Sequence, residues 1–317
     1  MSKPHFFVLG GAGFIGSHLV DELVTRGSVT VFDNLSVGRR EFIAPALASG
    51  SARLVVGDAL ALPELEQALA GHDVVFHLAA NPEARAGLSN TRLDLEQGTI
   101  VTYNVLEAMR RTGAHNLVLA SSGTVYGDTP RVCAEDDLGP LPISLYGASK
   151  LASEALASAF VSCFGLKAWI FRFGNVIGPR GTHGAALDFL NKLKADPDEL
   201  EVLGDGRQSK PYVHVSDCVA GMLFGLTHAR EPLNVFNLAP RDFTTAQRIA
   251  ELCILHSPYP NASIRFSGGE RGWPGDVPTS RLDPGKLEAL GFRVSRSSEQ
   301  AVDAAVSALS REVFGAG

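Results

Sequence analysis

Cysteine is scarce in this sequence of 317 residues, and its pattern excludes several kinds of site. Only four cysteines occur, and none forms a C-x-x-C pair or stands with a histidine at metal-ligand spacing. We therefore expect buried or half-buried thiols in a reducing compartment, without disulfides and without a structural metal. This usage predicts a cytoplasmic protein.

Basic charge and long apolar runs are also missing. The chain has 28 Lys and Arg against 34 Asp and Glu, a net charge of −6. No basic surface therefore predicts nucleic-acid binding, and no lysine-rich helix predicts a membrane surface. The longest apolar runs are strand-sized, far short of the ~20 residues that span a bilayer. Because the N-terminus also lacks the charged and apolar regions of a signal peptide, we expect no membrane partner.

Glycine is abundant by contrast, and one glycine-rich turn lies near the start. The sequence GGAGFIG at 10–16 follows the apolar run 5–9 and opens an amphipathic stretch, in the order strand, turn, helix. Such a turn leaves N–H groups uncovered at a helix N-terminus, where the helix dipole favours an anion. Gly10 permits the tight turn, Gly13 lets a pyrophosphate approach, and Gly16 lets the helix pack on the strand. The alternative is a tight turn that binds no ligand.

A second strand-like run, 29–32, ends at Asp33. An acidic residue about 20 residues past the glycines accepts hydrogen bonds from the ribose hydroxyls of an adenine dinucleotide. Because a carboxylate repels a 2′-phosphate, Asp33 favours NAD over NADP. Arg39 and Arg40 lie nearby and would weaken that preference, unless they are solvated surface arginines.

Strand-like and helical stretches alternate through the first two-thirds of the chain. Several apolar runs are continuous, which is typical of parallel strands covered on both faces. This rhythm predicts an α/β fold with a Rossmann-type, doubly wound parallel sheet. The expected strands are 6–9, 29–32, 53–56, 74–77, 116–120 and 168–173, and the expected helices are 62–69, 98–112 and 145–164.

After residue 175 the pattern changes, because Gly and Pro become frequent. We expect a smaller, interleaved C-terminal domain that binds the substrate, formed by about 176–212 plus 239–317. The dinucleotide-binding domain would then comprise 1–175 plus about 213–238.

Two hydroxyl-bearing motifs could carry the chemistry. Tyr146 and Lys150 are four residues apart on a predicted helix, so they share one face. A nearby ammonium and a bound nicotinamide cation both favour the phenolate, so we expect the pKa of Tyr146 to fall from about 10 toward neutrality. Ser122 and Thr124 follow the run 116–120, which places their hydroxyls at the carboxyl edge of the sheet, where ligands of such folds bind. An exposed helical pair without a role is the alternative for Y-x-x-x-K alone.

Together these motifs resemble those of the extended short-chain dehydrogenases/reductases, most of all the UDP-glucose 4-epimerases and similar nucleotide-sugar epimerases. The matching segments cover almost the whole chain: GGAGFIGSHL, VFDNLS, GDAL, HLAAN, SSGTVYG, YGASK, FRFGNVIGP, GDGRQSKPYVHVSD and GDVP. The resemblance implies NAD as cofactor, a UDP-linked nucleotide sugar as substrate, and reversible 4-epimerisation through a 4-keto sugar. It also implies a homodimer that pairs the helices 98–112 and 145–164.

The resemblance also implies roles for individual residues. The reactive cluster would be Ser122, Thr124, Tyr146 and Lys150. The implied cofactor contacts are Gly10, Gly13, Phe14, Ile15, Asp33, Asn34, Asp58, Ala59, Leu78, Ala79, Ala80, Tyr146 and Lys150. The candidate substrate contacts are Asn175, His183, Lys210, Arg271, Asp276 and Arg85, of which Arg85 would pair with a sugar carboxylate unless it is a surface arginine.

The sequence departs from the family pattern at several positions. Gly98 stands where the family usually has Asn, and Trp273 stands where it has Arg, with Arg271 displaced by two residues. Lys210 replaces another usual arginine and loses the bidentate fork. Ser280 stands where some epimerases have a bulky tyrosine, which leaves room for a 2-acetamido group and predicts that N-acetylated sugars are accepted.

Other activities remain open. A UDP-uronate 4-epimerase or another nucleotide-sugar modifying short-chain enzyme is one alternative. A dehydratase or decarboxylase would carry acidic residues where this chain has Gly123 and Thr124. A non-catalytic NAD-binding sensor is the alternative from another class, although such proteins commonly lack the Tyr/Lys pair.

Overall fold

The computed structural model describes residues 3–137 and 139–315, which fall into two compact units. The first unit contains residues up to 125 together with 145–172 and 222–236, and the second contains 126–144, 173–221 and the residues from 237 onward. The sequence placed 126–144 in the dinucleotide-binding domain, whereas here this segment belongs to the second unit. It is held there by hydrogen bonds from Cys133 N to Arg281 O, 3.0 Å, and from Asp283 N to Cys133 O, 2.9 Å.

The first unit is built on a seven-stranded parallel sheet with the order β3-β2-β1-β4-β5-β6-β11. The strands are β1 (His5–Leu9), β2 (Ser28–Asp33), β3 (Ala52–Val56), β4 (Val74–His77), β5 (Asn116–Ser122), β6 (Lys167–Phe173) and β11 (Leu233–Leu238). β1 pairs with β2 on one side and with β4 on the other, so that Leu9 is level with both Phe32 and His77. This is a Rossmann-type doubly wound sheet, and the predicted fold class is confirmed.

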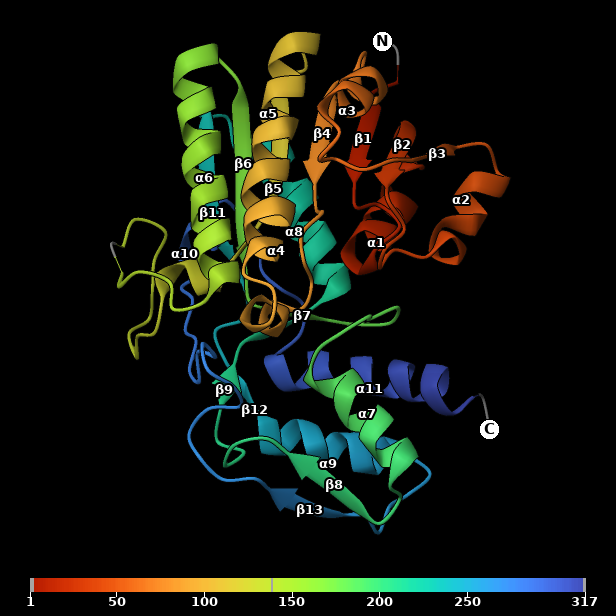
Figure 1. Cartoon of the computed structure of the whole chain (residues 1–317), viewed down its shortest axis with the longest axis vertical. Helices are drawn as coiled ribbons and strands as arrows, with labels where there is room; N and C mark the ends of the chain where they lie inside the picture. Colours follow the sequence, from red (N-terminus) through yellow and green to blue (C-terminus); the bar gives the residue numbers. More distant parts are fainter. Residues whose placement is uncertain (1–2, 138, 316–317) are drawn as a thin grey trace. The chain divides into compact units, whose positions relative to one another are not determined.

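Helices cover the sheet because its strands are apolar toward both faces. Figure 1 shows α5 and α6 side by side along the sheet, and α3 also packs against α5. The core between them contains Phe7, Leu65, Val105, Met109 and Leu117, all fully buried. The helices are α1 (Phe14–Leu23), α2 (Ala44–Ala48), α3 (Leu62–Leu69), α4 (Arg92–Asp94), α5 (Val101–Thr112), α6 (Leu145–Phe164) and α8 (Val215–His228).

Short turns of other helix types join these elements. They are η1 (Arg40–Ile43), η2 (Ala84–Leu88), η3 (Leu95–Ile100) and η4 (Gly123–Tyr126). The turn η3 is π-helical and lies between α4 and α5. The predicted helix 98–112 therefore begins in a π-helical turn, and its α-helical part starts only at Val101.

The second unit has its own core around three helices, α7 (Ala185–Ala195), α9 (Ala246–His256) and α11 (Ser298–Phe314). Figure 1 shows these helices together, with β8 and β13 along one side. Helix α11 begins at a capping box, in which the Ser297 side chain accepts from Gln300 N and the Gln300 side chain accepts from Ser297 N. The remaining elements are β7 (Asn175–Ile177), β8 (Glu199–Val202), β9 (Ser209–Lys210), β10 (Tyr212–His214), β12 (Thr244–Thr245), β13 (Ser263–Phe266) and α10 (Gly285–Ala289).

Residues 3–137 and 139–315 contain neither a membrane-spanning helix nor a cluster of metal ligands. None of the helices there is long and apolar enough to cross a membrane. No group of three or more His, Cys, Asp or Glu side chains in the same residues could hold a metal ion.

Candidate active site

The glycine-rich turn joins β1 to α1 at the carboxyl edge of the sheet. Gly10 has a φ of +76°, and a Cβ on it would come to 2.8 Å from Ala79 N. A Cβ on Gly16 would come to 2.1 Å from Gly10 O, so helix and turn pack without a side chain between them. Gly13 is the N-cap of α1 and has no side chain to cap the first N–H groups. These N–H groups remain available to an anion, so the turn fits a pyrophosphate.

The loop after β4 lies beside this turn. Leu78 N donates to Leu9 O at 3.0 Å, and Ala79 is the residue that a Cβ on Gly10 would meet. Between β1 and β4 the order of the strands reverses, because β2 and β3 are added on one side of β1 and β4, β5 and β6 on the other. Ligands of doubly wound sheets bind at such a switch point. The predicted cofactor residues Leu78, Ala79 and Ala80 are therefore next to the predicted glycines.

Asp33 ends β2 and is buried. Its carboxylate accepts hydrogen bonds from Ala12 N at 3.0 Å and Leu35 N at 2.9 Å. Burial raises the pKa of Asp33, and the two N–H donors oppose that rise. A Cβ on Gly38 would come to 2.8 Å from Asp33 Oδ1, so glycine there leaves the carboxylate uncovered by a side chain. Because each carboxylate oxygen accepts more than one hydrogen bond, Asp33 retains acceptors for ribose hydroxyls.

The outer cofactor candidates are more exposed. Asn34 is exposed, and its side chain accepts from Ser36 N at 3.0 Å. Asp58 is exposed and accepts from Leu60 N at 2.9 Å, whereas Ala59 is buried. Phe14 and Ile15 form the start of α1, directly after the N-cap.

The four residues predicted to react lie together in the first unit. Ser122 ends β5, and its hydroxyl accepts from Thr124 Oγ1 at 3.0 Å. The side chains of Ser122 and Tyr146 also share a hydrogen bond. Lys150 is buried one turn further along α6, with Nζ 5.7 Å from the centroid of the Tyr146 ring, and it donates to Ala120 O at 2.8 Å.

The residues of the chain do not by themselves bring the pKa of the phenol toward neutrality, which was expected from the ammonium and a bound nicotinamide cation together. Burial and the negative charge of Asp94 raise the pKa of Tyr146 to about 12, against the lowering effect of the Ser122 hydrogen bond. Lys150 is itself desolvated, which lowers its pKa to about 8. The residues of the chain alone therefore hold Tyr146 protonated, and ionisation near neutral pH requires further positive charge.

A buried ion pair beneath the cluster was missed from the sequence. Arg172 donates to Glu154 through Nη2 at 2.7 Å and through Nε at 3.0 Å, and Ser121 Oγ also donates to this carboxylate. Glu154 follows Lys150 by one turn of α6, and its charge raises the pKa of Lys150 against the effect of burial. The sequence signal for Glu154 was its position four residues after Lys150, which places it on the same helical face as Tyr146 and Lys150.

His77 is buried at the end of β4. Its Nε2 lies 3.0 Å from Thr102 Oγ1, and burial lowers the pKa of His77 to about 3. The imidazole is therefore neutral, which agrees with a packing role.

Three of the candidate substrate contacts lie together in the second unit. Lys210 Nζ is 2.7 Å from Asp276 Oδ1, and Arg271 Nη1 donates to Asp276 O at 2.6 Å. Arg271 Nη2 also donates to Asp128 Oδ2 at 2.6 Å, a partner that the sequence did not indicate. Trp273, at the family's usual arginine position, is half-buried in the same segment. Two cations are thus held by carboxylates in one cluster.

The other three candidates have different surroundings. Asn175 begins β7, and its side chain hydrogen-bonds with Tyr212. His183 is exposed, and its Nδ1 lies 3.2 Å from Thr182 Oγ1. Arg85 is exposed in the turn η2 of the first unit.

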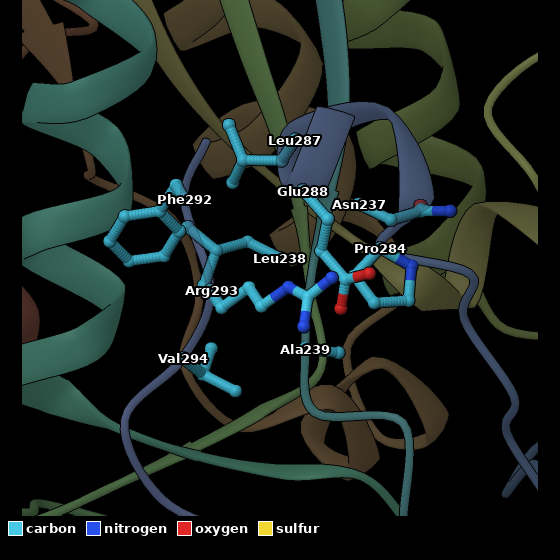
Figure 2. Close-up of a pocket in the computed structure, with 9 residues that line it drawn as sticks. All are labelled: Asn237, Leu238, Ala239, Pro284, Leu287, Glu288, Phe292, Arg293 and Val294. Carbon is cyan, nitrogen blue, oxygen red and sulfur yellow. The ribbon is translucent and has the colours of Figure 1, made fainter. Parts of the chain in front are cut away.

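One pocket in the second unit lies outside these clusters. Figure 2 shows the nine residues that line it, among them the apolar Leu287, Phe292 and Val294 and the charged Glu288 and Arg293. Glu288 is already paired with Arg241 at 2.7 Å. None of the predicted site residues lines this pocket, and we assign no function to it.

Known proteins share this architecture along its length. A putative UDP-glucose 4-epimerase of Methanocaldococcus jannaschii is 31% identical over 298 residues, which cover 90% of this chain and 92% of that protein. A crystal structure of a UDP-galactose 4-epimerase has a TM-score of 0.86 at 37% identity and covers 97% of this chain and 99% of its own.

A UDP-glucuronic acid 4-epimerase from Bacillus cereus, solved with UDP-glucuronic acid and NAD, also has a TM-score of 0.86, at 25% identity, with 97% of this chain and 99% of its own covered. The model of the NAD dependent epimerase/dehydratase family matches residues 6–239. This match spans well over half of the chain, which therefore belongs to the NAD dependent epimerase/dehydratase family and has NAD as its cofactor.

Proposed function

We propose that this enzyme is a nucleotide-sugar 4-epimerase that interconverts UDP-glucose and UDP-galactose and also accepts their N-acetylated forms. The observation that carries the proposal is the hydrogen bond between Ser122 and Tyr146, with Lys150 buried beside the phenol. Because the hydroxyls of Ser122 and Tyr146 lie together, both can hydrogen-bond the same carbinol oxygen of a sugar. The relatives named above that act at C4 of UDP-sugars support the same assignment.

In this proposal Tyr146 moves a single proton. As the phenolate it takes the proton from the C4 hydroxyl of the sugar, while Ser122 hydrogen-bonds the same oxygen. Lys150 holds a positive charge next to the phenol and favours its ionised form. When bound, NAD supplies a hydride acceptor that later gives the hydride back. Tyr146 returns the proton to the same oxygen after the sugar has turned its other face, so C4 is inverted.

The cofactor contacts follow from the turn geometry and remain part of the proposal. Gly10 and Gly13 would expose N–H groups to the pyrophosphate, and Asp33 would accept from the adenine ribose. Lys150 would also bind the nicotinamide ribose. The outer contacts would be made by Phe14, Ile15, Asn34, Asp58, Ala59, Leu78, Ala79 and Ala80.

The substrate contacts are proposed on charge and size. Lys210 and Arg271 would bind the diphosphate, with Asp276 orienting both cations. Asn175 and His183 would contact the sugar nucleotide. Ser280 is small and half-buried, which leaves room for a 2-acetamido group.

A UDP-uronate 4-epimerase is the second candidate. Arg85 favours it, because an exposed guanidinium can pair with a sugar carboxylate, and the Bacillus cereus enzyme acts on such a sugar. Water elimination is disfavoured, because Gly123 and Thr124, in the turn η4 directly after β5, supply no acid.

A homodimer in the cytoplasm remains part of the proposal. Tyr103 on α5 and Phe164 on α6 are 45% and 48% exposed, so apolar rings are uncovered on both neighbouring helices. Such rings suit helix pairing between two copies.

NMR of purified protein with UDP-glucose, UDP-N-acetylglucosamine and UDP-glucuronic acid tests the activity. We expect the 4-epimers of the first two to appear, and Tyr146→Phe to abolish the change while NAD stays bound. Conversion of UDP-glucuronic acid alone would favour the second candidate. A protein that binds NAD but leaves every nucleotide sugar unchanged would refute the proposal and favour the sensor.

A further inference from the structure

One buried carboxylate beside the Tyr146–Lys150 pair has no assigned task. Asp94 ends α4 and is only 2% exposed. Its Oδ1 accepts a hydrogen bond of 3.0 Å from Asn81 Nδ2, and the Asn81 side chain is fixed in turn because it accepts from Glu83 N at 3.0 Å. Asp94 Oδ2 is buried and has no hydrogen-bond partner within residues 3–137 and 139–315. The carboxylate is thus held in place through one oxygen only.

The neighbouring backbone is shaped to admit this carboxylate. Gly87 lies in the turn η2, and a Cβ on it would come to 2.7 Å from Asp94 Oδ2. Directly after Asp94 the chain enters the π-helical turn η3, and such turns occur often at functional sites. Glycine at 87 and the π-helical turn are two independent features of the backbone around one carboxylate.

Most charges that face Asp94 are already balanced by other partners. The elements packed against α4 are η2, η3 and α6. Their titratable and charged groups, with that of α4 itself, are Arg85, Arg92, Glu96, Tyr146, Lys150, Glu154 and the exposed Cys163. Arg85 is exposed, Arg92 pairs with Glu96 at 2.7 Å, and Glu154 pairs with Arg172. Asp94 therefore acts on Lys150 and Tyr146, and its charge raises the pKa of both.

We propose that Asp94 makes this site prefer the oxidised, positively charged nicotinamide over the reduced form. The same charge opposes loss of the Tyr146 proton until the nicotinamide is bound. The inference rests on the proposed function, which places the nicotinamide beside Tyr146. The charges of Asp94 and Lys150 offset each other, so a phenolate would leave one negative charge unbalanced. Oxidised nicotinamide supplies the missing positive charge, and the neutral reduced ring does not. Asp94 is thus a positioning residue that acts through Tyr146 and Lys150.

The test compares the affinities of Asp94→Asn for the two cofactor forms, without any sugar. Asparagine keeps an oxygen that accepts from Asn81 and removes the charge. We expect the dissociation constant of NAD⁺ to rise about tenfold, the equivalent of one pKa unit of interaction, while that of NADH stays unchanged. Calorimetry measures the first and nucleotide fluorescence the second. The matched control is Glu96→Gln, which removes one negative charge from the exposed ion pair with Arg92 and should change neither constant.

A second readout follows the phenol itself. The ultraviolet absorbance of the phenolate, taken as the difference from Tyr146→Phe, gives the titration of Tyr146 in cofactor-free protein. We expect this titration to move to lower pH in Asp94→Asn and to stay in place in Glu96→Gln. If Asp94→Asn does not fold, Gly87→Ala displaces the carboxylate while keeping its charge, and we expect a smaller change in the same direction.

An unchanged ratio of NAD⁺ to NADH affinity, or an unchanged titration, would overturn the inference. Failure of the proposed function is a separate result, because these measurements need no substrate. A protein that epimerises no sugar but shows the altered ratio would keep the inference and refute only the activity.

Discussion

Replacing each of two glycines in the glycine-rich turn by alanine should have different effects. Gly16→Ala should lower stability, and Gly13→Ala should weaken NAD binding. A Cβ on Gly16 would lie 2.1 Å from Gly10 O and 2.7 Å from Gly11 Cα, and both obstacles are backbone that cannot rotate away. A Cβ on Gly13 would meet only Gly10 O, at 3.2 Å. Gly16→Ala therefore perturbs the packing of α1 on β1, whereas Gly13→Ala mainly covers the N–H groups that we assign to the pyrophosphate.

The expected magnitudes follow from these contacts. Overpacking of a tight site costs about 1–3 kcal/mol, and a contact of 2.1 Å with backbone belongs at the upper end. Alanine offsets about 1 kcal/mol through its better helix propensity, so we expect Gly16→Ala to lower the free energy of unfolding by about 2 kcal/mol. At the N-cap, where glycine is favoured over alanine, Gly13→Ala should lower it by only about 0.5–1 kcal/mol, but it should weaken NAD binding on the order of tenfold, about 1.4 kcal/mol.

Urea unfolding measures the first quantity and calorimetric titration with NAD the second. The reasoning is refuted if Gly16→Ala unfolds at the same urea concentration as the parent protein. It is also refuted if Gly13→Ala binds NAD with parental affinity, because the turn would then not be the place where the pyrophosphate approaches.

Three further predictions concern other parts of the first unit. Tyr146→Phe should lower the epimerisation rate about 10²–10⁴-fold with NAD still bound, and a rate near that of the parent in the NMR assay would count against proton transfer by Tyr146. Arg172→Met should leave the buried Glu154 without its cation and destabilise the protein by about 3–5 kcal/mol in urea unfolding, while a parental midpoint would show that the pair is not buried in solution. Hydrogen bonds from Arg110 and Arg111 lower the pKa of Glu107 to about 2 from an ordinary value of 4.5, so its stabilisation is fully present above pH 4.5 and is lost as the pH falls toward 2. We therefore expect the urea midpoint of Glu107→Gln to depend less on pH in that window than the midpoint of the parent protein. An equal pH dependence in both proteins would contradict the assignment.

The sheet and the reacting residues were predictable because their signals are local. Continuous apolar runs such as 74–77 and 116–120 indicate parallel strands wherever they lie in the chain. The spacing of Tyr146 and Lys150 fixes one helical face, and the glycine turn is a single short motif. Such signals need no knowledge of which distant segments meet.

The features that escaped prediction depend on tertiary contacts. Asp94 approaches Tyr146 only because α4 packs on α6. Arg172 on β6 meets Glu154 on α6 only because α6 packs on β5, the strand beside β6. The high pKa of Tyr146 in the chain alone was not predictable for the same reason, since its burial and the charge of Asp94 come from folding. The segment 126–144 was placed with the wrong neighbours because its partners lie about 150 residues further along the chain, near Leu282.

The path of the backbone has a practical outcome for anyone who divides this protein. The chain changes from one compact unit to the other after residues 125, 144, 172, 221 and 236. A single proteolytic cut or a single truncation therefore never releases either unit whole, and no continuous gene fragment encodes one of them. A homologous half cannot be exchanged by one recombination event, so the two units are inherited, expressed and engineered as a single piece.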